Sequence, residues 1–450
     1  MAKEKQLFAC SACGAESNKW SGQCSTCGAW NTIAELVEPP GGAGRFRGYS
    51  GTLSPVQRIA DLPTEGVARL STSLEELDRV LGGGLVPGSV VLMGGDPGVG
   101  KSTCLLQVCC NMSETCKVLY ITGEESLQQI AMRAERLDLP DKNLLLLAET
   151  LVENICSTAE NEKPRVMVID SIQTMQAADI QSAPGSVTQV RESAALLTQF
   201  AKQTGTAIFL IGHVTKTGDL AGPRVLEHII DVVCYIEGDS GGRFRMIRAI
   251  KNRYGAVNEL GVFAMTEKGL KEVKNPSAIF LSRHNDSLPG SMVTSIWEGS
   301  RPLLVEIQAL VDDSYSDYPR RVAIGLDQNR ITMLLAVLHR HGGIPSHNKD
   351  VFVNVVGGVR VMETGADLAL LLAIVSSLKG QPVNQDLLCF GEVGLAGEIR
   401  PVPGGQERLR EAVKHGFRKA IIPAANAPKS GLKGIEIITV RKLSEALEAM

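Results

Sequence analysis

The chain has 450 residues, 44% of them hydrophobic, and its 46 basic and 49 acidic residues leave a formal net charge of −3. This length predicts about two to four domains, and the balanced charge excludes a protein that is basic over its whole surface, so any DNA-binding surface has to be local. Residues 1–6 are charged and lack the apolar core of a secretory signal, and the apolar run 368–375 is too short to cross a bilayer. We therefore expect a cytoplasmic protein with no membrane partner, whose cysteines are thiols or metal ligands rather than disulfides.

Two Cys-x-x-Cys pairs lie near the N-terminus, with ten residues between them and a glycine after each pair. This spacing is typical of a zinc ribbon in which four cysteines bind the metal tetrahedrally, and a redox motif or coincidence is the alternative. Zinc would supply about 10 kcal/mol or more of folding free energy to a segment whose own core is too small. We predict a zinc finger over residues 1–37, in which Zn²⁺ is held by Cys10, Cys13, Cys24 and Cys27. The other seven of the eleven cysteines lie among apolar residues and are predicted to be core thiols.

Residues 38–66 are rich in proline and glycine, which predicts a flexible linker. Arg45 and Arg47 lie in this linker, where they either contact nucleic acid or, in the interpretation that we favour, are simply solvated. The pattern then changes to alternating strands and helices, which we assign to a second domain over residues 67–275. Its first element is a short amphipathic helix over 73–81 that a run of three glycines ends.

A strand at 90–93, a glycine-rich loop at 95–102 and a helix at 103–112 follow one another directly. The loop fits G-x-x-x-x-G-K-[ST], in which glycines let backbone N–H groups curl around phosphate oxygens and the following helix points its dipole at the anion. Lys101 would reach the β- and γ-phosphates, and the Ser102 hydroxyl would bind Mg²⁺. The alternative, a chance glycine-rich turn, is disfavoured by the strand before the loop and the helix after it. The predicted ATP-binding residues are Gly95, Asp96, Pro97, Gly98, Val99, Gly100, Lys101, Ser102 and Thr103.

Further apolar strands are predicted at 118–122, 166–170, 207–211 and 232–236, between helical stretches. Near-continuous apolar strands of this kind indicate a parallel sheet covered on both faces. In an open sheet of this class the functional site lies at the carboxyl ends of the strands.

Polar side chains follow three of these strands. Asp170 fits the carboxylate that holds Mg²⁺ through water. Glu124 or Glu125 would activate the attacking water, although Glu125 also suits the first turn of a helix. His213 is either a sensor of the γ-phosphate or only a hydrogen-bonded residue at a strand end.

Two polar stretches follow the last of these carboxylates. Residues 214–224 are polar and glycine-rich, as in a binding loop. Residues 243–253 carry five basic side chains and no acidic one. They form a solvated strand edge, contact the phosphates of DNA, or contact a neighbouring subunit's nucleotide.

The composition shifts again near residue 276, and we assign residues 276–450 to a third, α/β-like domain without a nucleotide motif. A long apolar helix is predicted over 364–378, and a strand-turn-strand over 391–399. His339, His341 and His347 are close in sequence, and for these we favour a surface turn over a metal site because no cysteine flanks them.

The stretch 70–102 resembles the core of RecA-type ATPases. A second stretch matches the Lys-Asn-Arg-Phe-Gly signature of a bacterial family of DNA repair ATPases, with tyrosine in place of phenylalanine. It consists of Lys251, Asn252, Arg253, Tyr254 and Gly255. The leading four-cysteine motif and the trailing domain follow the order of parts in that family. The resemblance implies ATP-driven branch migration of recombination intermediates by a hexameric ring on single-stranded DNA. It implies ATP, Mg²⁺ and Zn²⁺ as cofactors, and single-stranded and branched DNA, the RecA recombinase and replicative helicase components as partners.

The resemblance also implies roles for single residues. Glu124 is at the position of the catalytic glutamate of RecA-type proteins, beside Lys101 and Asp170 as the other catalytic residues. Lys251 and Arg253 resemble residues that reach a neighbour's nucleotide and couple DNA binding to hydrolysis.

The C-terminal part is similar to the proteolytic domain of Lon in residues 352–358 and 391–395. Lon proteases use a Ser–Lys dyad in which the lysine activates the serine. Here Gln406 is at the lysine position and the nucleophile is missing from residues 363–368. The resemblance therefore implies a protease fold without protease activity, kept as an assembly platform and a contact for duplex DNA. The competing hypotheses are an ATP-dependent protease and a nucleotide-gated assembly ATPase that does not bind DNA.

Overall fold

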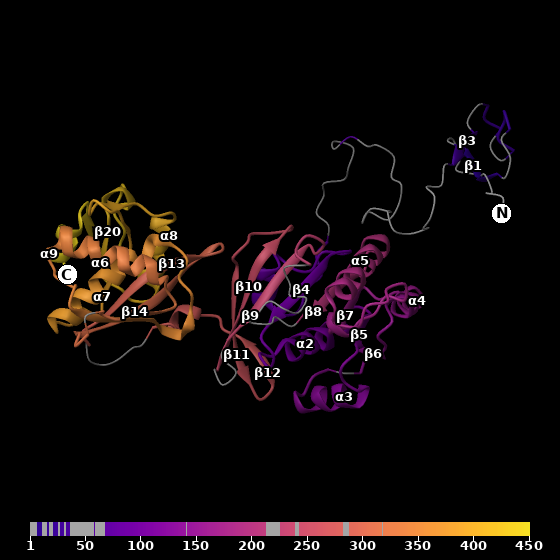
Figure 1. Cartoon of the computed structure of the whole chain (residues 1–450), viewed down its shortest axis with the longest axis horizontal. Coiled ribbons are helices and arrows are strands. Elements are labelled where there is room, and N and C mark those ends of the chain that lie inside the picture. Colours follow the sequence, from indigo (N-terminus) through magenta and orange to yellow (C-terminus); the bar gives the residue numbers. More distant parts are fainter. Residues whose placement is uncertain are drawn as a thin grey trace. The chain divides into compact units, whose positions relative to one another are not determined.

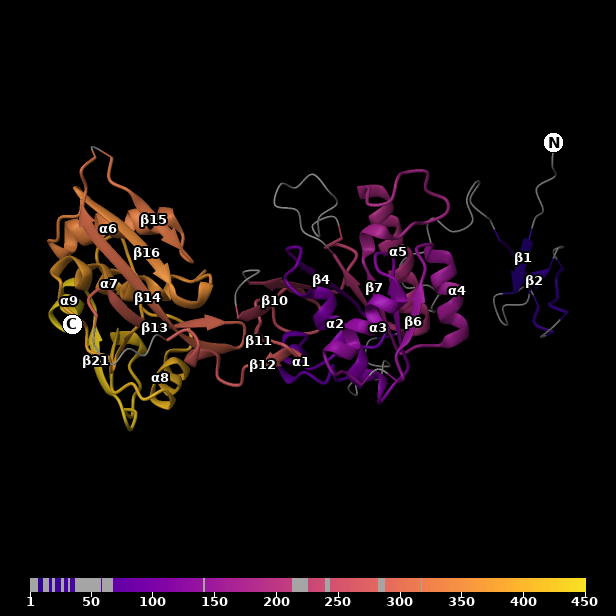
Figure 2. The same cartoon turned by 90° about the horizontal axis from the view of Figure 1, so that it is seen from below.

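A computed structural model describes residues 7–10, 16–17, 21–25, 28–30, 33–36, 58, 68–140, 142–212, 226–238, 243–281, 288–316 and 318–450. The chain divides into two compact units, Met1–Ser54 and Pro55–Met450, whose elements are labelled in Figures 1 and 2. No helix in the described part of the chain is long and apolar enough to cross a membrane.

The first unit contains a small antiparallel sheet with the order β2-β1-β3, formed by β1 (Leu7–Cys10), β2 (Glu16–Ser17) and β3 (Ile33–Leu36). Of the four predicted zinc ligands, Cys24 is described with its side chain, which is buried. Its backbone N–H donates to Ala29 O, and its carbonyl accepts from Gly28 N–H. Cys10 ends β1, and the side chain of Cys10 and all of Cys13 and Cys27 lie outside the described residues.

The second unit begins with a nine-stranded sheet of order β12-β11-β10-β9-β4-β8-β7-β5-β6. The six strands from β9 to β6 run parallel, and β10, β11 and β12 extend the sheet antiparallel. Its strands are β4 (Val90–Gly95), β5 (Val118–Thr122), β6 (Leu145–Ala148), β7 (Val166–Asp170), β8 (Ala207–Ile211), β9 (Val232–Glu237), β10 (Phe244–Asn252), β11 (Leu260–Thr266) and β12 (Gly269–Glu272). Its helices are α1 (Glu75–Val80), α2 (Lys101–Ser113), α3 (Leu127–Arg136), α4 (Val152–Glu162) and α5 (Val187–Thr204).

Helices cover both faces of this sheet, which confirms the prediction from its apolar strands. Val91 and Met93 of β4 pack with α1, α2 and α3 on one face, whereas Val90 and Leu92 pack with α4 and α5 on the other. Because successive side chains of a strand point to opposite faces, a strand buried on both faces has to be apolar at nearly every position.

Five of the seven remaining cysteines are buried thiols, as predicted: Cys104, Cys109, Cys110, Cys234 and Cys389. Burial raises the pKa of Cys104 and of Cys234 to about 12, so these side chains are protonated, apolar packing groups at neutral pH.

A second sheet follows, of seven strands in the order β15-β16-β14-β13-β17-β20-β21. Its strands are β13 (Ser291–Glu298), β14 (Arg301–Asp313), β15 (Arg321–Ile324), β16 (Lys349–Val355), β17 (Leu387–Cys389), β20 (Lys419–Pro423) and β21 (Glu436–Val440), and the short pair β18 (Glu392–Val393) and β19 (Ile399–Arg400) forms the predicted strand-turn-strand. The helices are α6 (Gln328–Gly342), α7 (Asp367–Lys379), α8 (Gly405–Lys414) and α9 (Leu443–Glu448). One face packs on α6, α7 and α9, and the other packs on α8.

Element boundaries differ from the sequence patterns by a few residues. The first helix of the second unit begins at Glu75 rather than residue 73, and the helix after the glycine-rich loop begins at Lys101 rather than residue 103. The long apolar helix begins at Asp367, after the 3-10 turn η6 (Thr364–Ala366). His339 is in α6, and its ring packs edge to face on that of His347 with the ring centroids 6.3 Å apart.

Candidate active site

The glycine-rich loop connects β4 to α2 and holds its shape through glycines at positive φ. Gly95 has φ 151° and Gly100 has φ 107°. A Cβ atom at Gly95 would lie 2.6 Å from the carbonyl oxygen of Ile236, and one at Gly100 would lie 2.9 Å from Cε of Met265. At Gly98 a Cβ would meet nothing within 4 Å. The loop is therefore packed tightly at its two ends and open at its middle, as a phosphate cradle has to be.

Lys101 lies at the first turn of α2 with its side chain folded back over the loop. Its Nζ donates to the carbonyl oxygens of Gly95 (2.9 Å) and Asp96 (3.0 Å). Burial lowers the pKa of this ammonium, and the carboxylates of Asp170, Glu124 and Asp96 act in the opposite direction. The cation thus lies near the carboxylates of Asp170, which ends β7, and of Glu124, which follows β5.

Asp170 ends β7 and is buried. Its carboxylate accepts hydrogen bonds from the hydroxyls of Tyr120, on β5, and of Ser102. Burial raises the pKa of Asp170, and these two hydrogen bonds only partly oppose that rise. A hydroxyl and a carboxylate beside each other form an oxygen donor set that suits Mg²⁺.

Glu124 and Glu125 follow β5 but have different surroundings. The carboxylate of Glu124 accepts a hydrogen bond from the Ser171 hydroxyl and acts on the Lys101 ammonium. The carboxylate of Glu125 instead pairs with Arg133 of α3, and its backbone N–H donates to the Thr122 hydroxyl (3.0 Å). Both carboxylates raise the pKa of Asp170, but of the two it is Glu124 that also acts on the Lys101 ammonium.

The basic run on β10 has a role that the sequence did not indicate. Arg245 is buried, and its Nε donates to the carbonyl oxygen of Val99, within the glycine-rich loop (2.8 Å). Arg248 is also buried, and its guanidinium pairs with Glu298 on β13 of the second sheet. The interpretation as a solvated strand edge is wrong for these two arginines, because both side chains are buried and each guanidinium has an internal partner. Contact with DNA or with a neighbour's nucleotide stays a prediction. A sequence pattern does not distinguish a buried, paired arginine from an exposed one.

Residues 251–255 form a compact motif at the end of β10. The Lys251 ammonium donates to the carbonyl oxygens of Ile230 (2.8 Å) and Glu227. Arg253 pairs with Asp231 (3.1 Å), a buried carboxylate that also pairs with Lys202 (2.6 Å).

The other residues of the motif anchor it to the core. Asn252 donates to the carbonyl oxygen of Val80 (3.3 Å) and accepts from Tyr254 N–H (2.8 Å). A Cβ atom at Gly255 would lie 2.7 Å from Cα of Gly82, which explains a glycine there. The hydrogen bonds found for these five residues, within the described ranges, do not reach the glycine-rich loop.

Two predicted parts of the site, His213 and the loop 214–224, lie outside the described residues.

Comparison with protein families gives three matches. Residues 56–219 match an AAA domain, residues 8–35 match a rubredoxin metal-binding domain, and residues 321–426 match the subunit ChlI of Mg-chelatase. The first match implies a nucleotide-binding ATPase and the second a metal-binding module.

Curated relatives extend over the full chain. The DNA repair protein RadA of Pseudomonas aeruginosa is 61% identical and covers 100% of both chains. The proteins of the same name from Escherichia coli and Bacillus subtilis are 62% and 48% identical and cover 98% and 99% of both chains. The chain belongs to the RadA family of DNA repair ATPases. Membership of the RadA family confirms the fold class predicted from the motifs, which is a zinc ribbon, a RecA-like P-loop core with a parallel sheet and a Lon-like α/β domain.

In this RadA family member the region that corresponds to the Lon dyad is occupied by a different ion pair. Both oxygens of Glu363 accept from the guanidinium of Arg408 (2.7 Å each). Arg408 is fully buried and lies over the rings of Trp297 and Phe390. Gln406, two residues earlier on α8, is exposed. A bidentate pair with a fully buried guanidinium and a half-buried carboxylate serves packing, and the Glu363 carboxylate that it occupies is not available as a base.

Proposed function

We propose that this protein is a DNA-dependent ATPase of recombinational repair, which drives branch migration of recombination intermediates on single-stranded DNA as a ring-shaped hexamer. The observation that carries the proposal is the meeting of Lys101, Ser102, Asp170 and Glu124 at one edge of a parallel sheet, in a chain of the RadA family. Its DNA substrates are single-stranded and branched, its protein partners are a RecA recombinase and replicative helicase components, and it acts in the cytoplasm.

In the proposed reaction the positively and negatively charged groups of the protein have different roles. The backbone amides of residues 95–103 and the Lys101 ammonium bind the phosphates of ATP. Ser102 and Asp170 hold Mg²⁺, which when bound neutralises charge on the transferred phosphoryl group. Glu124, oriented by the Ser171 hydroxyl, accepts the proton of the attacking water.

The motif at residues 251–255 supplies the proposed coupling between subunits. In the single chain Lys251 and Arg253 are held by the turn that contains Glu227 and Asp231. We infer that in the ring they exchange these partners for the nucleotide of a neighbour, as cations supplied in trans do in other phosphoryl-transfer enzymes. The four N-terminal cysteines are proposed to hold Zn²⁺ in a module that engages DNA or a partner.

For the C-terminal domain we propose an assembly platform and a duplex DNA contact, without proteolysis. The Glu363–Arg408 pair and the exposed Gln406 support the second part of this proposal. A casein degradation assay tests it, because any ATP-dependent cleavage by the purified protein contradicts it.

The proposed function is tested by steady-state ATP hydrolysis with and without single-stranded DNA, across a salt series. We expect stimulation by DNA that falls steeply with salt, because neutralised phosphates release counterions. Lys101→Ala should abolish turnover, and Lys142→Ala, which removes an exposed lysine of the same domain, should not. Hydrolysis that is indifferent to DNA at every salt concentration would overturn the proposal.

A further inference from the structure

Tyr120 carries a hydroxyl inside a strand that is buried along its whole length. All five residues of β5 are buried, and Tyr120 is 0% exposed. Its ring packs in one cluster with Val118, Val168 and the apolar side chains of α2. A phenylalanine ring would fill the same space, and a buried hydroxyl costs free energy unless it has a hydrogen-bond partner. The question is therefore what this hydroxyl binds.

The register of β5 and β7 directs the hydroxyl to Asp170. The two strands are parallel, and Thr122 lies beside Asp170. Because side chains alternate between the faces of a sheet, Tyr120 lies on the same face as Thr122 and Asp170, and this face packs on α2. The Tyr120 hydroxyl donates to Oδ2 of Asp170, and Ser102, the second residue of α2, donates to the same carboxylate. The carboxylate is thus held between β5 and the helix that follows the glycine-rich loop.

The donor that β5 supplies to Asp170 is neutral. A tyrosine hydroxyl is protonated at neutral pH and an ionised carboxylate only accepts, so this hydrogen bond has one direction. It fixes the plane of the Asp170 carboxylate, because rotation about the Cβ–Cγ bond would move Oδ2 away from the hydroxyl. By contrast, the carboxylate of Glu125 is held by the charged guanidinium of Arg133. Tyr120 therefore restricts the orientation of Asp170 without adding a positive charge.

We propose that Tyr120 is a positioning residue for Mg²⁺: its hydroxyl holds the Asp170 carboxylate in the orientation in which Asp170 and Ser102 hold the ion. This inference rests on the proposed function, in which these two residues hold Mg²⁺ for ATP hydrolysis. Carboxylates that bind metals are oriented by outer hydrogen bonds of this kind, and loss of such a bond weakens metal binding or activity about 10–100-fold.

Binding of Mn²⁺ to the full-length protein with a non-hydrolysable ATP analogue tests the proposal without turnover. The electron paramagnetic resonance signal of free Mn²⁺ reports how much of the ion is bound. Tyr120→Phe removes one oxygen atom and keeps the ring, so the packing of β5 is retained. We expect the Kd for Mn²⁺ to rise about tenfold or more in this variant. Asp170→Asn, which removes the proposed ligand itself, is the reference variant.

The possible outcomes separate this proposal from the proposed function. If Asp170→Asn loses Mn²⁺ and Tyr120→Phe binds it as tightly as the parent protein, the role of Tyr120 is wrong and the ATP site stands. If Asp170→Asn binds Mn²⁺ as tightly as the parent, Asp170 is not a ligand, and both the proposed ion site and the role of Tyr120 are wrong.

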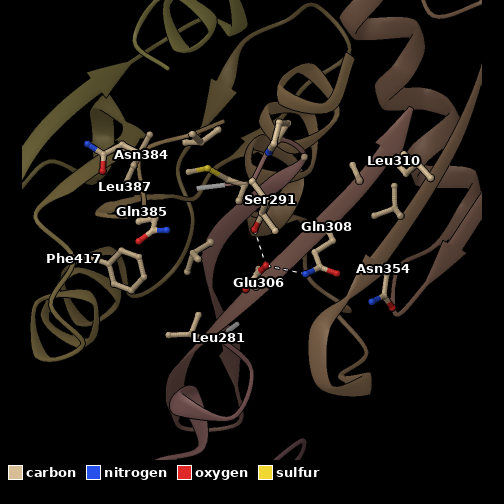
Figure 3. Close-up of a pocket in the computed structure, with 18 of the residues that line it drawn as sticks. Leu281, Ser291, Glu306, Gln308, Leu310, Asn354, Asn384, Gln385, Leu387 and Phe417 are labelled. Atoms are coloured by element: carbon tan, nitrogen blue, oxygen red, sulfur yellow. Dashed lines mark hydrogen bonds between the residues drawn. The ribbon is translucent and has the colours of Figure 1, made fainter. Parts of the chain in front are cut away.

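Ser291→Ala is the matched control, because it removes the same kind of hydrogen bond outside the nucleotide site. Figure 3 shows Ser291 of β13 directed at Glu306 of β14, in a pocket of about 890 Å³ in the second sheet. The Ser291 hydroxyl donates to the carboxylate of Glu306 (2.6 Å), which is 3% exposed. We expect this variant to bind Mn²⁺ as the parent does. An equal loss in Ser291→Ala and Tyr120→Phe would indicate a general effect on the fold and contradict the proposed role.

The Mg²⁺ dependence of turnover gives a second readout. If Tyr120 acts on the ion through Asp170, Tyr120→Phe should reach the kcat of the parent when the Mg²⁺ concentration is raised about tenfold or more. Glu124→Gln should not recover in this way, because its proposed defect is in proton transfer. A kcat of Tyr120→Phe that stays low at saturating Mg²⁺ would mean that the hydroxyl does more than position the ion ligand, and the proposal would be wrong.

Discussion

The P-loop site and the region that corresponds to the Lon dyad each bring a buried cation to a carboxylate, yet the two arrangements differ in how the charges are satisfied. Lys101 is bound by two backbone carbonyls and faces several carboxylates, of which Asp170 has a raised pKa because burial outweighs its hydrogen bonds. Arg408 and Glu363 instead satisfy each other through two parallel hydrogen bonds. Several charged groups that converge from different elements indicate a binding site, whereas a cation and a carboxylate that satisfy each other bidentately indicate a structural role.

The largest difference in effect is expected between the two glutamates that follow β5. Glu124→Gln should reduce ATP turnover about 10²–10⁴-fold while nucleotide binding remains, because the proposed proton acceptor is lost. Glu125→Gln should retain most activity, since the Glu125 carboxylate is already paired with Arg133. ATP turnover and the affinity for a fluorescent ATP analogue are measured in both variants, to show which glutamate is needed for hydrolysis. Equal loss in both variants would contradict the assignment of the water-activating role to Glu124.

The paired charges of the C-terminal domain should matter for stability alone. Arg408→Ala leaves Glu363 without its buried partner and should destabilise that domain by about 3–5 kcal/mol. The double variant Arg408→Met/Glu363→Gln should recover much of this loss, because no buried charge remains. Denaturant unfolding followed by near-ultraviolet circular dichroism measures both. If Arg408→Ala is as stable as the parent protein, the Arg408–Glu363 pair does not stabilise the domain.

Arg245 combines features of both regions, because it is a buried cation with an internal partner and that partner is in the glycine-rich loop. Arg245→Ala removes the hydrogen bond to the Val99 carbonyl, and a bond to a charged group contributes about 1.5–3 kcal/mol. We expect the KM for ATP to rise about tenfold or more, with kcat less affected, and Arg245→Lys to recover part of the loss. Arg243→Ala is the matched control, since Arg243 is exposed on the same strand approach. An unchanged KM in Arg245→Ala would show that the loop holds its shape without this contact.

The smallest expected effect concerns the pH dependence of stability. Because the pKa of Asp170 is raised above its ordinary value of 3.8, the folded state binds more protons than the unfolded state between the two values, so stability falls as pH rises through that window. Above the raised pKa the Asp170 carboxylate is ionised in the folded state, so the full free-energy cost of burying its charge lowers the stability. Asp170→Asn should therefore raise the neutral-pH Tm of the nucleotide-free protein by about 2–4 °C. The difference from the parent should shrink as pH falls through the window, and a lower Tm in the variant at neutral pH would contradict this account.

Much of the fold was predictable because its signals are local. The strands at 118–122, 166–170 and 207–211 have the bounds that their apolar runs indicate, and the glycine-rich loop lies between a strand and a helix as its motif requires. The two-sided burial of the sheet followed from composition alone. Helix starts were less accurate by two or three residues, because capping and 3-10 turns depend on neighbours outside the helix.

The zinc ligation, the domain boundaries, the roles of the site residues and the ring stay predictions. Three of the four cysteine side chains lie outside the described residues, and the roles of Lys101, Glu124, Asp170 and residues 251–255 await the experiments above.

The sequence by itself determined the class of the core, the phosphate-binding loop and the order of the parts, because each depends on residues within a few positions of one another. Only the tertiary structure decided which charges are available. The partners of Arg245 and Arg408 lie 146 and 45 residues away along the chain, and which residues of the second sheet α8 covers depends on where that helix packs. No local pattern encodes such distances, because burial and pairing are properties of the folded chain as a whole.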